Sequence, residues 1–213
     1  MQRAAADDPA ARVVAESRRD YDLLMVGAAP HHLVAASLLG RVLPHIELPS
    51  VIVRAGRDPI PECFERLLVP HDGSVFSRAA VEFAFAYAEA SRARLTLLHV
   101  LNETRVSTGT LTAPEERGAH APSRALEREI ETQVRAHFES LGQQSGVSFD
   151  VRILASGDPS ETIVNVARAD DIDLLVLGAE NKMLARPLFF GQGTAAIVER
   201  AECTTAVVVP FVG

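Results

Sequence analysis

The chain has 213 residues, 47% of them hydrophobic, and a net charge of −7 at pH 7. This length suits one large or two small domains, and the acidic charge argues against a nucleic-acid or anionic-membrane surface, because phosphates bind to basic faces. The two cysteines, Cys63 and Cys203, form no CxxC motif, and no apolar run reaches the roughly 18 residues that span a bilayer. We therefore expect a cytoplasmic protein without a disulfide framework.

The first quarter of the chain predicts a helix and two strands. A helical pattern follows Asp8, an apolar strand ends at Gly27 in "DLLMVG", and a second strand occupies "PSVIVRA". Residues 57–61 read as a linker to the rest of the chain.

From residue 62 onward, short apolar runs alternate with helical patterns, which is typical of a parallel α/β sheet. Strands are predicted at 66–70, 94–101, 147–154, 172–178 and 204–211, with helices between them. Asp158, Pro159 and Glu161 form a capping-box-like helix start, and 102–123 is predicted as a long loop. The fold class is therefore α/β, with a five-stranded parallel sheet flanked by helices.

The N-terminal segment repeats the end of the chain. Residues 8–56 match residues 158–210, with "DLLMVG" aligned on "DLLVLG" and "SVIVR" on "TAVVVP". We therefore assign 1–56 to the C-terminal half of a domain and 62–213 to a complete one. Each copy ends in a strand that would otherwise be a bare edge. We predict that these two last strands pair antiparallel, within the chain or between two chains.

The chain resembles the universal stress protein (UspA) family. "LLVPHDGSVFSRAAVEFAFAYAEASRARLTLLHV" is similar to that family's opening strand, helix and second strand. "DLLVLGAEN", "FFGQG" and "AECTTAVVVP" are similar to its closing G-x2-G-x9-G-(S/T) motif and last strand. The resemblance implies an α/β fold that often binds ATP at the strand ends. It also implies dimers or tandem domains joined through the last strand.

Five residues at the strand ends match positions that would hold the adenosine part of the nucleotide. The resemblance places Pro70 and Asp72 in the family's P-x-D motif, where the carboxylate accepts hydrogen bonds from ribose or adenine. Val100 matches a position that packs on adenine, and Leu177 precedes Gly178 at the end of its strand. Gly178 would let the backbone approach the ligand closely.

The phosphate end of the site departs from the family pattern. Gly191, Gln192, Gly193 and Thr194 open a helix whose free N–H groups and positive dipole end suit a triphosphate. Asn181 stands in place of the second glycine, and Gln192 in place of the hydroxyl residue. Asn tolerates a left-handed conformation, so the turn can survive while its side chain occupies space near the phosphates. Two interpretations therefore remain open: a nucleotide site that still works, and the same fold without a ligand.

The first copy is predicted to hold no ATP. Gly27 and Gly40 remain, but Pro30 occupies the second-glycine position and Arg41 follows Gly40. This copy also has no P-x-D strand of its own.

The remaining candidates are assigned structural roles. His31 and His32 are read as solvated, His99 and Cys203 as packed in the fold, and the charged helix 124–142 as a solvated face.

Three functions follow from these features. The first is a regulatory module that binds ATP or another adenine nucleotide, with no metal beyond nucleotide-bound magnesium and with loop 102–123 as a lid. The second is a nucleotide-free interaction domain of a cation/proton antiporter or amino-acid permease, tethered to the inner face of the membrane. The third and weakest is a nucleotide-hydrolysing enzyme, because the chain lacks an SGGxDS loop, a GxxxxGK[ST] loop and a Ser/His/Asp elbow. We expect that the protein is not an enzyme and has no nucleic-acid partner. We also expect that it forms a homodimer or an intrachain pseudo-dimer.

Overall fold

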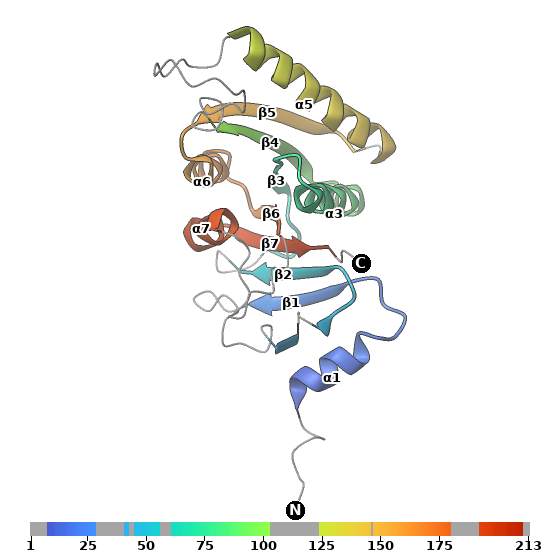
Figure 1. Cartoon of the computed structure of the whole chain (residues 1–213). Coiled ribbons are helices and arrows are strands. Elements are labelled where there is room, and N and C mark those ends of the chain that lie inside the picture. The colour runs from blue at the N-terminus through green and yellow to red at the C-terminus, as the bar shows by residue number, and fades with distance from the viewer. Residues whose placement is uncertain are drawn as a thin grey trace, which may run out of the picture.

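The protein is described from a computed structural model, which describes residues 8–28, 41–42, 45–55, 61–102, 124–145, 147–179 and 192–210. Its centre is one seven-stranded sheet with the order β1-β2-β7-β6-β3-β4-β5, which runs the length of the molecule (Figure 1). All neighbouring strands are parallel except β2 and β7. The sheet is therefore mixed but mostly parallel.

The N-terminal segment forms the sheet's lower end in Figure 1. Its main elements within the described residues are α1 (Pro9–Glu16), β1 (Leu24–Ala28) and β2 (Ser50–Arg54). The Asp8 side chain accepts a hydrogen bond from the backbone N–H of Ala10 and so caps α1, whose first residue is Pro9. Ala10 and Leu24 belong to a small separate apolar cluster that holds α1 to this end of the sheet.

The rest of the chain forms the complete alternation that the sequence predicts. Its elements are β3 (Arg66–Pro70), α3 (Val75–Ser91), β4 (Arg94–Asn102), α5 (Arg124–Ser145), β5 (Phe149–Ser156), α6 (Pro159–Ala169), β6 (Leu174–Gly178), α7 (Gln192–Arg200) and β7 (Thr204–Val209). The predicted cap of α6 is confirmed, because Asp158 Oδ1 accepts a hydrogen bond from Glu161 N at 3.0 Å.

Two apolar layers hold the helices to the sheet. Helices α6 and α7 cover one face, where Leu68, Leu98 and Leu175 lie in a core with Ile163 and Val198. Helices α3 and α5 lie over the other face, where a second core forms around α3 and the buried Phe138 of α5. Side chains alternate between the two cores along the central strands β2, β7, β6 and β3, because successive residues of a strand point to opposite faces.

The last strands of the two segments meet in the middle of the sheet. β2 and β7 pair antiparallel, with Ser50 opposite Val209 and Ile52 opposite Val207. The buried guanidinium of Arg54 adds a hydrogen bond from Nη2 to the carbonyl oxygen of Ala201, at 2.6 Å. The predicted antiparallel pairing of the last strands is confirmed, and it occurs within one chain.

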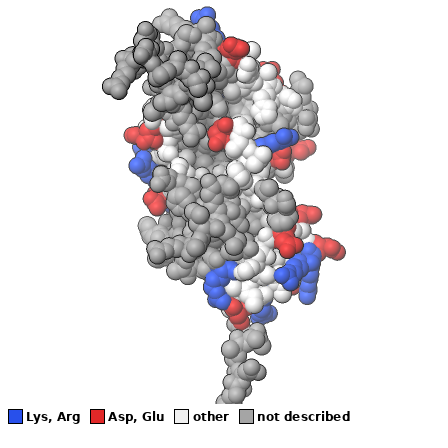
Figure 2. All heavy atoms as spheres, in the orientation of Figure 1, with Lys and Arg blue, Asp and Glu red and all other residues white. Residues whose placement is uncertain are grey.

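The predicted α/β class is confirmed. The five predicted strands of the C-terminal unit all form, and the two N-terminal strands extend the same sheet to seven. None of the helices within the described ranges combines the length and apolar character that a membrane crossing requires. Among the described residues on the face in Figure 2, acidic and basic side chains are interspersed and form no large basic region.

Candidate functional site

A cleft of about 220 Å³ opens at the carboxyl ends of β3, β4 and β6. Ligands of open α/β sheets bind at this edge, where the strands end and the helices begin. The lining residues come from the turn after β3, from β4 and β6, and from the first turns of α6 and α7: Pro70, His71, Asp72, Ser74, Ser77, Leu98, Val100, Pro159, Ser160, Ile163, Leu177, Gly178, Gly193, Thr194 and Ile197. Seven of the ten residues predicted for the site line this cleft.

The turn after β3 fixes the Asp72 carboxylate in the wall of the cleft. Asp72 Oδ1 accepts a hydrogen bond from Ser74 N at 3.0 Å, and Gly73 has the left-handed φ of +85° that this tight turn needs. Ser74 in turn caps α3, because its Oγ accepts a hydrogen bond from Ser77 N at 3.1 Å. The turn is therefore held from both sides.

The Asp72 carboxylate is ionised at neutral pH. Its partial burial alone would raise the pKa of Asp72, but hydrogen bonds from Ser74 and Ser77 and the nearby His71 outweigh it and leave the pKa below its ordinary value. An ionised carboxylate on a rigid turn is an acceptor for hydroxyl or amino groups of a ligand.

His71 is a buried residue of this turn that the sequence analysis did not single out. Its side chain is 6% exposed, and its Nδ1 accepts a hydrogen bond from Gly73 N at 3.2 Å. Its backbone joins the neighbouring strand: His71 N donates to the Leu98 oxygen at 2.8 Å, and His99 Nδ1 donates to the His71 oxygen at 2.7 Å. His71 therefore ties the turn to β4.

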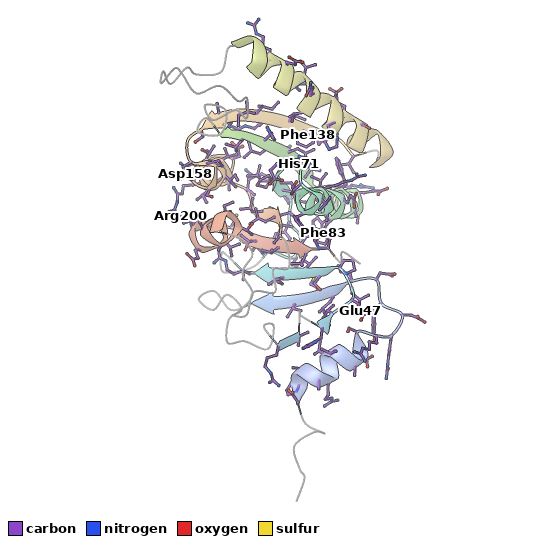
Figure 3. The ribbon with its side chains drawn as sticks, viewed as in Figure 1. Glu47, His71, Phe83, Phe138, Asp158 and Arg200 are labelled. Atoms are coloured by element: carbon purple, nitrogen blue, oxygen red, sulfur yellow. The ribbon has the colours of Figure 1, made fainter. Side chains whose placement is uncertain are left out.

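The His71 imidazole is neutral because of its surroundings. Burial first, and then the neighbouring His137 and His99, lower the pKa of His71 from 6.5 to about 4, against the opposing effect of Asp72. The ring packs edge-on against Phe138 of α5, with centroids 5.0 Å apart (Figure 3). Since Nδ1 accepts from Gly73, the proton lies on Nε2, which is buried without a hydrogen-bond partner among the described residues.

Two helix N-termini form part of the wall of the cleft. α6 begins at Pro159 and α7 at Gln192, and a Cβ placed on Gly193 would lie 3.7 Å from Ser160 Oγ, so the two first turns are adjacent. The first N–H groups of a helix have no partner within it and carry partial positive charge, which favours anions. Thr194 adds a half-buried hydroxyl residue to this wall.

Gly178 serves a packing role that the sequence did not reveal. A Cβ at this position would lie 2.1 Å from the backbone oxygen of Phe76 and 2.6 Å from Ser77 N, inside the first turn of α3. Only glycine allows β6 to end this close to α3. The close approach at Gly178 is thus to the protein's own backbone, which brings α3 and its capping turn to the cleft.

Some predicted positions lie outside the described residues. These are Asn181, Gly191, His31 and His32, and the segment 103–123 that covers nearly all of the predicted loop. Gln192 begins α7, but its side chain is also outside this range. Cys203 is buried as predicted, whereas Cys63 is exposed. Within the described ranges, no three His, Cys, Asp or Glu side chains come together as metal ligands would.

A scan against known families matches residues 64–209 to the universal stress protein family. The chain belongs to this family. A relative described as a universal stress protein in the QAH/OAS sulfhydrylase 3′ region of Thermus aquaticus is 28% identical over 145 residues, which are 68% of this chain and 98% of the relative.

A solved structure of the family shares the fold over nearly the whole chain. A universal stress protein of Archaeoglobus fulgidus DSM 4304 aligns with a TM-score of 0.63 and 18% identity, over 94% of this chain and 66% of that chain. Its likeness therefore takes in the N-terminal strands as well. A family protein from Arabidopsis thaliana, described with AMP bound, aligns over 68% of this chain and 92% of its own, with 18% identity and a TM-score of 0.46.

Proposed function

We propose that this universal stress protein binds an adenine nucleotide in the cleft at the ends of β3, β4 and β6, and that it acts as a regulatory module. One observation carries the proposal. The cleft is lined both by an ionised acceptor, Asp72, and by two adjacent helix N-termini. A nucleotide has the complementary polarity, with hydroxyl and amino donors at one end and anionic phosphates at the other.

Much of the remaining wall of the cleft is apolar. Leu98, Val100, Leu177, Ile163 and Ile197 line it, so a flat purine ring would be buried against hydrocarbon. In this arrangement Asp72 holds the ribose or adenine, and the α7 amides from Gln192 to Thr194 face the phosphates. Any magnesium would arrive with the nucleotide.

We expect binding without catalysis. The imidazole beside the cleft, His71, uses Nδ1 to hold Gly73, so it has no free lone pair with which to take a proton. Incubation with ATP followed by measurement of ADP checks this expectation. Stoichiometric binding with no ADP above the rate in buffer is the expected result.

Calorimetric titration with ATP and AMP tests the binding proposal. Asp72→Asn removes the anionic acceptor and should weaken binding by roughly 1–3 kcal/mol. Asp150→Asn is the matched control, because Asp150 is an exposed carboxylate at the beginning of β5, at the opposite end of the strands. Asn181→Gly restores the family's glycine and should strengthen binding. If neither the parent chain nor Asn181→Gly binds nucleotide, the nucleotide-free interaction domain is the better description.

Residues 1–56 are, in this proposal, a partial repeat of the same domain that holds no nucleotide of its own. α1, β1 and β2 repeat the order and the parallel strand pairing of α6, β6 and β7, and both helices begin with an Asp cap followed by Pro. The relatives reported above are described as universal stress proteins and none as part of a transporter. Attachment to a transporter therefore stays a prediction, to be tested by fractionating cells that express the natural gene.

A further inference from the structure

Arg54 is a buried arginine at the end of β2. Its side chain is 8% exposed and lies on the face of the sheet that α6 and α7 cover, as does that of Ile52 two residues earlier. Its Nη2 donates a hydrogen bond to the carbonyl oxygen of Ala201 at 2.6 Å, and its Nε has no partner among the described residues. No carboxylate of the described ranges forms an ion pair with Arg54. The carbonyl end of α7, which is the negative end of the helix dipole, therefore takes the place of an acidic partner.

The strand itself does not require an arginine at this position. Aligning "DLLMVG" on "DLLVLG" and following the pairings β1–β2 and β6–β7 makes Val209 the counterpart of Arg54. Val209 is buried in the apolar core beneath α6 and α7. A buried guanidinium costs free energy that a buried valine does not, unless its charge and its N–H groups are compensated. We therefore explain the arginine by its bond to α7.

α7 connects Arg54 to the cleft. Ala201 ends this helix, and its N–H donates a hydrogen bond to the Ile197 oxygen at 2.8 Å. Each helical N–H bonds to the carbonyl four residues earlier, so the same line of hydrogen bonds continues from Ile197 to Gly193. Ile197 and Gly193 both line the cleft. Holding the carbonyl of Ala201 thus holds the helix whose first turn forms part of the cleft wall.

The N-terminal segment also supports α7 by apolar packing. Ile52 of β2 belongs to the same buried core as Val198 and Ala201. Hydrophobic contacts of this kind are non-directional, whereas a hydrogen bond depends on distance and angle. The bond from Arg54 is therefore the contact between β2 and α7 that specifies where the helix lies.

We propose that Arg54 is the positioning residue through which the N-terminal partial repeat holds α7 at the nucleotide cleft. Its charge caps the carbonyl end of α7, and its hydrogen bond sets the place of the helix over the β2–β7 pair. Gly193 and Thr194 then face the ligand from a fixed position. As far as the ligand is concerned, this inference rests on the proposed function. It gives residues 1–56 a role although they hold no nucleotide, because they stabilise the site of the other copy.

Hydrogen–deuterium exchange of the full chain without ligand tests the link between Arg54 and α7. Arg54→Met keeps a long unbranched side chain but removes the charge and the donors. Amides of α7 should then exchange about tenfold faster, the scale of one hydrogen bond made by a charged group. Amides of α3, on the opposite face of the sheet, should exchange as in the parent chain. Arg54→Lys keeps the charge and one donor on a shorter side chain, so its α7 exchange should lie between that of the parent and that of Arg54→Met.

Thr205→Val is the matched control. Thr205 lies directly opposite Arg54 in the β2–β7 pair, and its Oγ1 is likewise buried without a hydrogen-bond partner among the described residues. The substitution removes a buried polar atom at the same place without touching the bond to Ala201. Exchange of α7 should therefore remain that of the parent chain.

Calorimetric titration of the same proteins with ATP completes the test. Arg54→Met should weaken ATP binding about tenfold, Arg54→Lys less, and Thr205→Val not at all. Circular dichroism checks the fold, and if Arg54→Met does not fold, Arg54→Lys must still exchange faster than the parent in α7.

Three results would overturn the inference: unchanged α7 exchange in Arg54→Met, exchange that rises equally in α3 and α7, or ATP binding as tight as that of a parent chain that binds ATP. If the parent chain binds no ATP, the proposed function fails. The exchange rates then decide by themselves whether Arg54 positions α7, and unchanged rates overturn that as well.

Discussion

β6 and β1 have nearly the same sequence and opposite surroundings. β6 ends at Gly178 beneath α3, with backbone atoms of that helix where a Cβ would be, whereas β1 passes through Gly27 with open space on the same face. The pattern of apolar run and glycine therefore specifies a strand in both places. What covers the strand, and so whether its end forms a cleft, depends on a helix elsewhere in the chain.

The largest expected difference is at the buried leucine of β6. Leu174→Ala should lower the free energy of unfolding by about 3–4 kcal/mol, because it leaves a cavity beneath α3. Leu23→Ala, at the equivalent exposed position, should cost less than about 1 kcal/mol. Urea denaturation at a protein concentration that keeps the chain monomeric gives both values. Similar costs at the two positions would mean that β1 is covered as β6 is.

The two glycines provide a second contrast. Gly178→Ala should cost about 2–3 kcal/mol, because the new methyl group overlaps the Phe76 carbonyl and α3 must shift. It should also weaken nucleotide binding, since α3 begins at the capping turn that holds Asp72. Gly27→Ala places its methyl group in open space and should change stability by less than about 0.5 kcal/mol. Thermal denaturation of the two variants side by side makes the comparison.

A third contrast is pH dependence, which belongs to the complete unit because only that unit contains His71. The pKa of His71 is about 4 in the folded protein, whereas a histidine in the unfolded chain has the ordinary pKa of 6.5. Between these two pH values the unfolded chain therefore binds a proton at His71 that the folded chain does not bind. Stability should therefore fall as pH drops from 6.5 to 4 and level off below. The full shift corresponds to about 3.4 kcal/mol, and solvent screening of this partly buried group reduces the expected loss to about 2 kcal/mol.

His71→Asn should remove that part of the slope while keeping an acceptor for Gly73 N. His45→Asn, at an exposed histidine of the N-terminal segment, is the control and should keep the slope. Denaturant midpoints measured across this pH range, compared between parent and variants, isolate the contribution of His71 from that of the carboxylates. An unchanged slope in His71→Asn would show that the imidazole is not held neutral by burial.

Much of this fold could be predicted from the sequence. The apolar runs located all the strands of the described ranges, and the need to cover two bare last strands predicted the antiparallel β2–β7 pairing. Asp158 and Pro159 marked the beginning of α6, because capping depends on neighbouring residues alone. The apolar runs and the cap are local features of the sequence, and the protection of edge strands is a general property of β-sheets.

The features that were not predicted depend on contacts between distant parts of the chain. His71 is buried because Phe138 of α5 packs against it, a contact between residues far apart in sequence. Gly178 is required by the backbone of α3 rather than by a ligand alone. The exposure of Met25 follows from an uncovered face of β1, while its counterpart Val176 has the same pattern and is buried. Periodicity places a strand but does not show which helix covers it.

The central claim is that only the copy covered by α3 forms a nucleotide site. Hydrogen–deuterium exchange of the full chain, with and without saturating AMP or ATP, tests it most directly because it locates the bound ligand. Protection is expected in peptides that contain Asp72 to Ser77 and Gly193 to Ile197, with no change across β1 and β2. Protection centred on β1, or binding without protection of the Asp72 turn, would contradict this account.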